Sequence, residues 1–518
     1  MLEHDIKKIL ISHDEITEAA KKLGAQLAKD YEGKNPILVG ILKGSIPFMA
    51  ELVKHIDTHI EMDFMMVSSY HGGTASSGVI KAGRSGHEAS FSITGARLVD
   101  PWVKLDMQAD LHVADGRIIA VGAAPHGFRP ARTIDGTGLV VSPGLVDLSA
   151  RLREPGFEYK ASLESEMQAA VAGGVTALAC PPDTDPPLDE PGLVEMLKYR
   201  AHNLGLAHLY PLGALTVGLK GQALTEMAEL TAAGCVGFAQ ASQPIQDTQV
   251  LLRAMQYAHS FGYTVWLNPV DPFLSRGGVM HAGPFASRLG LPGNPVTSET
   301  VALHTICELV ASVGCPVHLC RLSSAAGVEL VRQARKAGLP ITADVAINHL
   351  HLTDVDVGFF DSAYRLEPPL RAQRDRDALR AGLADGTLDA ICSDHTPVVE
   401  DAKRLPFGEA EPGAVGLSLL LPLSLKWGKE QGMSLVSVLD RLTRIPAGIA
   451  GIDPARKNEP AGLSVGARAD LCVFDPEESW VVNEKTLWGQ CTDTPWLGRE
   501  VQGRVRLTAV GGRLVFTR

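Results

Sequence analysis

Short apolar segments alternate with amphipathic stretches through the middle of this chain. The apolar segments end abruptly in polar residues, as buried strands do, and several of the stretches between them have helical periodicity. The predicted strands are 145–148, 175–180, 208–212, 235–238, 264–267, 316–320, 341–345 and 388–392, and the clearest helices are 163–172, 249–259, 300–313 and 325–337. Strands that alternate with helices in this number predict an α/β fold, a (β/α)₈ TIM barrel with a parallel sheet. Its functional groups should lie at the carboxyl ends of the strands.

The composition narrows the class of protein without changing this picture. The chain has 518 residues, of which 45% are hydrophobic and 21% charged, and its net charge is -11. This acidic balance argues against a nucleic-acid partner or a membrane surface. We find no apolar run long enough to span a bilayer and no signal peptide, and none of the eight cysteines forms a Cys-X-X-Cys pair. We therefore expect a cytoplasmic protein with free thiols.

The first 81 residues differ from the rest, being richer in Lys and Ile. Residues 37–42 and 59–67 have strand patterns, and 46–56 has helical periodicity. The segments Leu42-Lys43-Gly44 and Ser68-Ser69-Tyr70 resemble the pyrophosphate-contacting loop and the active-site flap of hypoxanthine phosphoribosyltransferases.

That resemblance stops near Lys81, because the acidic strand end and the phosphate-cradling Gly/Thr loop of the family do not follow. We therefore expect residues 1–81 to be a partial phosphoribosyltransferase fragment without catalysis, which favours a fusion origin. Residues 82–89 are predicted to be a linker.

The apolar strand at 145–148 leads into a polar loop that carries the most informative motif. The run from Gly144 to Gly156 resembles the first barrel strand of the dihydroorotases, a branch of the amidohydrolase superfamily, which ends in His-X-His-X-Arg. In that family the two histidines bind the catalytic zinc, and the arginine binds the substrate carboxylate. Here the corresponding residues are Ser149, Arg151 and Arg153. The sequence thus retains the arginine of the motif and lacks both of its histidine ligands.

The other strand ends depart from the family in the same way. The positions of its bridging carboxylate and remaining histidine ligands carry Gln240, Asn268 and Arg321, whereas the metal-bound general base is retained as Asp394. One carboxylate cannot hold Zn²⁺, and two guanidinium groups near the site would repel a dication. We therefore expect no cofactor, no metal and no catalytic residue, and we expect Arg151, Arg321 or both to pair with Asp394.

The substrate side departs as well. Two asparagines of the family are replaced by Asp183 and Glu367, while Arg153 survives. Both new carboxylates would repel an anionic dihydroorotate, so these three residues are expected to be remnants of a substrate site.

Four histidines near the strand ends leave an alternative open. His281, His318, His349 and His395 could build a rearranged metal site, although each is more readily explained as a structural residue. The alternation of side chains along 316–320 predicts that His318 points towards the helices, opposite Arg321.

The resemblance implies a division of the chain and a function. In addition to the fragment at 1–81 and the linker at 82–89, it implies a small β-sandwich built from 90–143 and 460–518, and a barrel at 144–459. It implies a pseudo-dihydroorotase that scaffolds the catalytic chain of aspartate carbamoyltransferase in pyrimidine biosynthesis, itself a homo-oligomer. The alternatives are an active cyclic-amide hydrolase with a rearranged zinc site, and a purine phosphoribosyltransferase.

Overall fold

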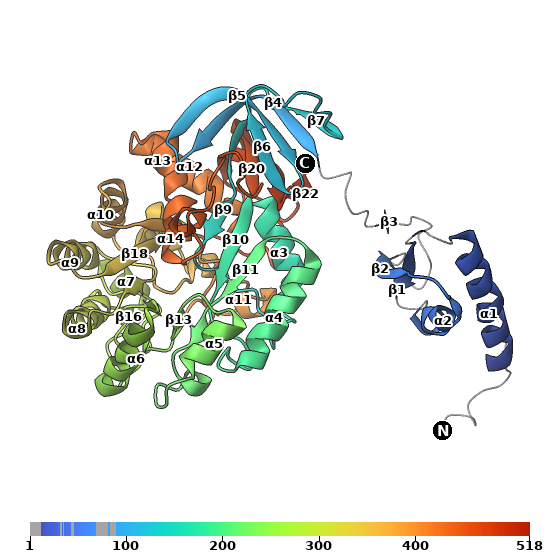
Figure 1. The fold of residues 1–518 in the computed structure, drawn as a ribbon. Coiled ribbons are helices and arrows are strands. Elements are labelled where there is room, and N and C mark those ends of the chain that lie inside the picture. The colour runs from blue at the N-terminus through green and yellow to red at the C-terminus, as the bar shows by residue number, and fades with distance from the viewer. Residues whose placement is uncertain (1–11, 32–33, 35, 43–45, 69–80, 83–89) are drawn as a thin grey trace. The chain divides into compact units, whose positions relative to one another are not determined.

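A computed structural model describes residues 12–31, 34, 36–42, 46–68, 81–82 and 90–518. The chain forms two compact units, Met1–Glu88 and Ala89–Arg518 (Figure 1).

The described residues of the first unit form a small three-stranded sheet and two α-helices. Helix α1 (His13–Asp30) starts with a capping box, in which Ser12 and Glu15 satisfy each other's backbone N–H groups. Strand β1 (Ile37–Leu42) pairs in parallel with β2 (Glu61–Ser68), and β2 pairs antiparallel with β3 (Lys81–Ala82). Helix α2 (Ile46–Leu52) follows β1, as its helical periodicity predicts.

Most of the motif residues that carry the transferase resemblance lie outside the described residues. These are Lys43 and Gly44 of the first loop and Ser69 and Tyr70 of the second.

In the second unit, one sheet contains strands from both the beginning and the end of that unit. Its order is β22-β21-β20-β8-β4-β5-β6, with β7 paired to β4. The strands are β4 (Phe91–Asp100), β5 (Leu105–Ala114), β6 (Arg117–Val121), β7 (Arg132–Asp135), β8 (Val140–Pro143), β20 (Leu471–Val481), β21 (Glu500–Val510) and β22 (Arg513–Thr517). The two ends meet where β20 pairs antiparallel with β8, and the sheet has its own apolar core, which includes Phe91, Leu98 and Val473.

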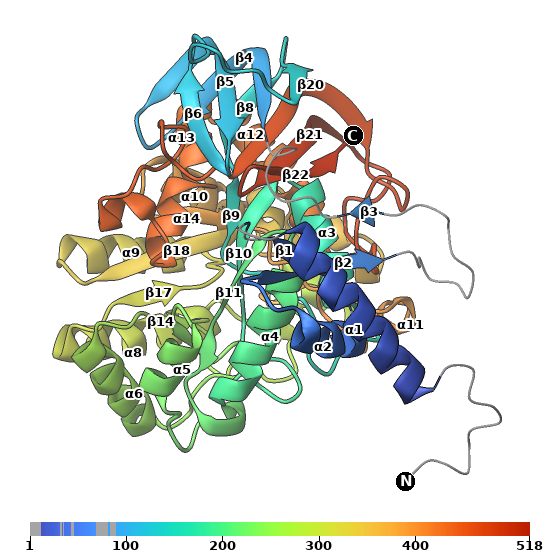
Figure 2. The same ribbon diagram turned by 45° about the vertical axis from the view of Figure 1, so that its right-hand side comes forward.

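The rest of this unit is the predicted (β/α)₈ barrel, whose strands pair in parallel (Figure 2). Its eight strand positions are β9 (Leu145–Asp147), β10 (Val175–Cys180), β11 with β12 (His208–Pro211, Gly213–Ala214), β13 (Phe238–Ala239), β14 (Val265–Leu267), β17 (Val317–Leu319), β18 (Ile341–Ala346) and β19 (Ala390–Cys392). The helices that follow them along the chain include α3 (Leu163–Ala172), α4 (Pro191–Leu204), α5 (Met227–Ala233), α6 (Thr248–Phe261), α8 (Thr297–Val313), α9 (Ala325–Lys336), α10 (Gln373–Ala384) and α12 (Leu420–Glu430).

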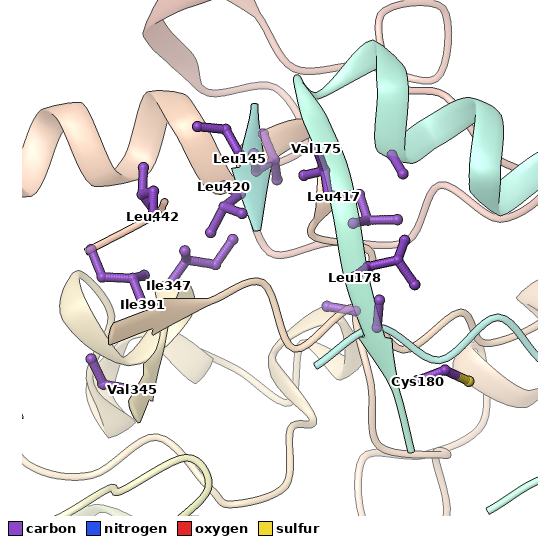
Figure 3. Packing of buried hydrophobic residues seen from close by; sticks show 14 of the residues in the cluster. Leu145, Val175, Leu178, Cys180, Val345, Ile347, Ile391, Leu417, Leu420 and Leu442 are labelled. Carbon is purple, nitrogen blue, oxygen red and sulfur yellow. The ribbon is translucent and has the colours of Figure 1, made fainter. Parts of the chain in front are cut away.

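Two apolar layers hold the barrel together. Inside it, Leu148, Trp266 and Cys392 belong to one buried cluster. Outside it, the other faces of the strands pack against the surrounding helices, and Figure 3 shows Leu145, Val175 and neighbouring side chains in this larger core. Successive strand residues point to opposite faces, and here both faces are buried. These short strands are therefore apolar throughout and lack an alternating pattern.

The barrel closes between its first and last strands through polar contacts. Ser393, directly after β19, donates its N–H to Asp147 Oδ1 at 2.9 Å and its hydroxyl to the other carboxylate oxygen. The Arg151 N–H donates to the His395 carbonyl at 2.8 Å, and the His395 N–H donates to the Ser149 carbonyl at 3.1 Å. These bonds fix the positions of the loops that follow both strands.

Within the described ranges, no helix is both long and apolar enough to cross a bilayer.

Burial raises the pKa of the Asp147 carboxyl to about 6, against hydrogen bonds from Ser393 that favour its ionised form. A folded-state pKa above that of the unfolded chain contributes stability at low pH, and this contribution is lost as the pH rises through 6. The shift of about two pKa units corresponds to about 3 kcal/mol. We predict that the free energy of unfolding of the wild type, relative to Asp147→Asn, falls by about 2–3 kcal/mol between pH 4 and pH 7.5. Urea unfolding at several pH values measures this difference, and a pH-independent difference would contradict it.

Candidate functional site at the barrel mouth

The carboxyl ends of the barrel strands bring the sequence-predicted residues to one end of the barrel. Ser149 and Arg151 follow β9, Gln240 follows β13, Arg321 follows β17 and Asp394 follows β19. Arg321 and Asp394 have left-handed backbones, with φ of 57° and 49°. Such backbones are uncommon away from glycine and cluster at functional sites, so these strand ends turn sharply where a site would be expected.

Two arginines converge on a single carboxylate oxygen. Arg321 Nη1 donates to Asp394 Oδ1 at 2.8 Å, and Arg151 Nη1 lies 3.6 Å from the same oxygen. The three side chains are between 6% and 11% exposed, so solvent screens these charges poorly. Burial disfavours the charged form of Arg321, but the Asp394 carboxylate raises its pKa above the ordinary value. The ion pairs that the sequence predicts for Asp394 are therefore present with both arginines.

Arg151 also binds a second carboxylate. Its Nε donates to Asp183 Oδ2 at 2.8 Å, and its Nη1 donates to the Thr396 hydroxyl at 3.1 Å. Burial opposes ionisation of Asp183, yet Arg151, with smaller contributions from Arg153 and Arg321, lowers the pKa of this carboxyl. Asp183 is thus a charged partner of Arg151 within the mouth.

Other residues at former ligand positions are bonded to neighbouring loops. The Gln240 amide donates to the Leu219 carbonyl at 2.9 Å and accepts from the Thr216 hydroxyl at 3.0 Å. The Asn268 amide donates to the Ala241 carbonyl at 2.9 Å. Ser149 is 7% exposed, and its backbone carbonyl takes part in barrel closure.

The retained substrate arginine binds the protein itself. Arg153 donates from Nε and Nη2 to the Pro397 carbonyl at 3.0 and 2.8 Å, and it lies 3.8 Å from Glu411. Glu367 has an exposed side chain, and its backbone carbonyl accepts from Arg321 at 3.2 Å.

The structure corrects the predicted orientation of His318. Its neighbours Val317 and Leu319 pack in the outer core, so His318 faces the barrel interior, where it contacts Trp266 edge-on. Its ring nitrogens bond Thr342 Oγ1 and Asp344 Oδ2, both at 2.9 Å. The prediction was wrong because it assumed that the alternation of strand side chains continues to Arg321, whose left-handed backbone interrupts it.

The remaining histidines also bond elsewhere. Burial lowers the pKa of His349 to about 4, and its Nε2 lies 3.0 Å from the Pro368 carbonyl. His395 Nε2 pairs with the fully buried Glu166, and its Nδ1 accepts the Gly416 N–H at 3.1 Å. Burial lowers the pKa of His281, whose Nδ1 lies 3.4 Å from Arg371.

The residues at the mouth do not fit a zinc ion. In the part of the chain that the structure describes, no group of three or more His, Cys, Asp or Glu side chains is placed to hold a metal. The retained carboxylate, Asp394, is engaged by two guanidinium groups, which stay protonated and would repel a cation. The cavities at the mouth measure about 30 Å³ beside Arg321 and about 110 Å³ beside Gln240 and Asn268, both below the roughly 300 Å³ at which small-molecule sites begin.

Asp344, which was not predicted from the sequence, holds both the backbone of Arg321 and the ring of His318 in place. Its Oδ1 accepts the backbone N–H of Arg321 at 2.6 Å, while its Oδ2 contacts His318. It is 1% exposed. A carboxylate inside a predicted apolar strand, 341–345, is the signal that could have identified it, since buried carboxylates are rarely unpaired.

We predict that Asp394→Asn lowers the free energy of unfolding by about 3 kcal/mol, because it leaves two buried guanidinium groups without their shared charge. The matched control is Asp385→Asn, which removes a carboxylate 3.0 Å from Arg332 in a pair that is 38% and 49% exposed. This control should cost less than about 1 kcal/mol. Equilibrium denaturation measures both, and equal effects would contradict the importance of the buried pair.

Comparisons with known proteins identify the families that the two parts of the chain resemble. The Dihydro-orotase-like family model matches residues 138–326, and the phosphoribosyl transferase domain model matches residues 7–99. The latter match runs past Lys81, where the motif resemblance ends, and into β4.

Curated relatives and solved structures extend the likeness over the whole second unit. A dihydroorotase-like protein of Pseudomonas aeruginosa is 45% identical over 426 residues, which cover 82% of this chain and 99% of the relative. A dihydroorotase of Geobacter sp. (strain M21) is 38% identical over 82% of this chain and 98% of the relative. The L-hydantoinase of Arthrobacter aurescens superposes with a TM-score of 0.72 at 25% identity, covering 82% of this chain and 96% of that one. The chain therefore belongs to the dihydroorotase-like family of amidohydrolases and carries a phosphoribosyltransferase domain match at its N-terminal end.

Proposed function

We propose that this protein is a catalytically inactive dihydroorotase homologue that scaffolds the catalytic chain of aspartate carbamoyltransferase in de novo pyrimidine biosynthesis. The observation that carries the proposal is the contact of Arg151 and Arg321 with the single oxygen Asp394 Oδ1.

Hydrolysis of a cyclic amide needs an activated water, and in this family a metal ion activates it. At this mouth Asp394 is the remaining carboxylate of the metal set, and both guanidinium groups hold it in an ion pair. The Oδ1 atom of Asp394 is therefore already engaged by Arg321 Nη1 at 2.8 Å, with Arg151 Nη1 at 3.6 Å, and both neighbours are cations that would repel a metal ion. The replacement of the two family asparagines by Asp183 and Glu367 further disfavours an anionic substrate.

The proposed scaffolding role requires an intact barrel fold and no catalytic group. The barrel keeps its strand pairing, its closure through Asp147 and Ser393, and a buried network at its mouth. A rigid barrel of this kind can present a surface to a partner without turning over a substrate. The partner itself, together with a homo-oligomeric state and a cytoplasmic location, comes from the family resemblance.

The alternative is an active cyclic-amide hydrolase with a rearranged site. The retention of Asp394 and the 38% identity to a relative named dihydroorotase favour it.

We predict that the purified protein contains far less than one equivalent of zinc and does not interconvert dihydroorotate and carbamoyl aspartate. Elemental analysis and absorbance assays measure these properties, and the Geobacter dihydroorotase treated identically is the positive control. Stoichiometric zinc that is lost in Asp394→Ala, with turnover to match, would overturn the proposal of inactivity.

We predict that the protein co-elutes with the cognate aspartate carbamoyltransferase catalytic chain in gel filtration, at a mass above that of either protein alone. Serum albumin in place of the transferase serves as the negative control. Two separate peaks at micromolar concentrations of both proteins would contradict the scaffold role, whatever the zinc content.

A further inference from the structure

A second, much larger cavity lies at the opposite end of the barrel from the mouth. It measures about 570 Å³ and is lined by the amino-terminal ends of β9 and β10, the loop after β4 and the segment that leads into β20. This volume falls within the roughly 300–1,000 Å³ of small-molecule sites, which often form where two structural layers meet.

The floor of this cavity is apolar and two aromatic rings stand beside it. Val146, Ala177 and Ala447 form a small buried cluster, and the half-buried Trp102 and Tyr210 pack against it. This cluster is separate from the two barrel cores, so the aromatic rings are not simply the edge of the main hydrophobic interior.

The indole of Trp102 is held in place by hydrogen bonds. Its Nε1 donates to Asp453 Oδ1 at 2.9 Å, and its backbone N–H donates to Asp100 at 2.9 Å. Asp453 also accepts the Ala455 N–H at 3.0 Å, which ties the indole to the turn that carries Lys457. An aromatic surface fixed in this way can stack a flat ring at little entropic cost.

Three cationic side chains lie on the rim of the cavity. Arg117 and Arg468 are direct partners in an isolated antiparallel β-bridge, and Lys457 lies on the same lining. Like charges directly opposite each other are unfavourable unless an anion compensates them. Among the lining residues three cations face two carboxylates, Asp470 and Glu459, while Asp100 and Asp453 are hydrogen-bonded to Trp102 beside the cavity.

The carboxylates leave part of this charge uncompensated. Arg468 Nε donates to Asp470 Oδ2 at 2.6 Å, and His208 lies 3.2 Å from the same oxygen. Arg117 Nη1 donates to the Gly466 carbonyl at 2.7 Å, which orients the guanidinium. Arginine pairs readily with phosphate oxygens through such a planar group.

We propose that this cavity binds a nucleoside monophosphate. Its planar base would lie against Trp102 and Tyr210, and its phosphate would lie near Arg117, Arg468 and Lys457. The site goes beyond the proposed scaffold function and is independent of it, because no residue of the mouth takes part.

The test is calorimetric titration of the full chain with UMP and AMP, with uridine and inorganic phosphate as the two halves of the ligand. The informative variants are Trp102→Leu, which removes the stacking surface, and Lys457→Ala, which removes an exposed cation. Arg456→Ala is the matched control, because this neighbouring cation is 68% exposed and lines a different cavity. We expect wild-type binding at micromolar to low-millimolar concentrations, weakened about tenfold by Trp102→Leu and about threefold to tenfold by Lys457→Ala, and changed less than twofold by Arg456→Ala.

Several results would overturn the proposal. The first is that neither nucleotide binds at about 5 mM. The second is that the wild type and both informative variants bind equally well, and the third is that inorganic phosphate binds as tightly as UMP. If Trp102→Leu does not fold, Lys457→Ala and the comparison of uridine with UMP decide the outcome.

Discussion

The mouth of this barrel depends on a buried set of charges that balance one another. Arg151 and Arg321 share Asp394, and Arg151 also binds Asp183, so two guanidinium groups meet two carboxylates. Isolated buried charges are strongly unfavourable, whereas paired and hydrogen-bonded charges are tolerated. This balance explains Asp183 in a way that substrate binding does not. The carboxylate that replaces a family asparagine supplies the negative charge that a second arginine requires.

The backbone around this set is fixed by carboxylates one layer deeper. Asp344 accepts the backbone N–H of Arg321, and Asp147 accepts both donors of Ser393 beside Asp394. The left-handed turns at Arg321 and Asp394 are held by these bonds, since such backbones persist only where their surroundings determine them. The mouth is therefore a structural unit in which the carboxylates of Asp394 and Asp183 are both engaged by arginines.

The two ends of the barrel consequently differ in character. The mouth has ion pairs beside cavities of about 30 and 110 Å³, whereas the opposite end has a cavity of about 570 Å³ with an apolar floor and cations on its rim. The loop after β4 contributes Trp102 to that second cavity, and strand β6 contributes Arg117. The charged side chains at the mouth thus bind one another, whereas the cavity at the opposite end has apolar and aromatic surface beside its cations.

The sequence by itself determined the barrel and the family frame of the strand ends, whereas the β-sandwich expected from residues 90–143 and 460–518 came from the family resemblance. The barrel and this frame follow from local runs of apolar residues and from motifs contiguous along the chain. The pairing of Arg151 and Arg321 with Asp394 was also predictable, because Asp394 is the carboxylate retained among ligand positions of which two carry arginine. Only the tertiary structure decided that Arg153 binds the Pro397 carbonyl, that His318 faces the barrel interior and that Asp344 supports Arg321. These contacts join residues far apart along the chain at turns where the regular alternation of strand side chains breaks, so no local pattern encodes them.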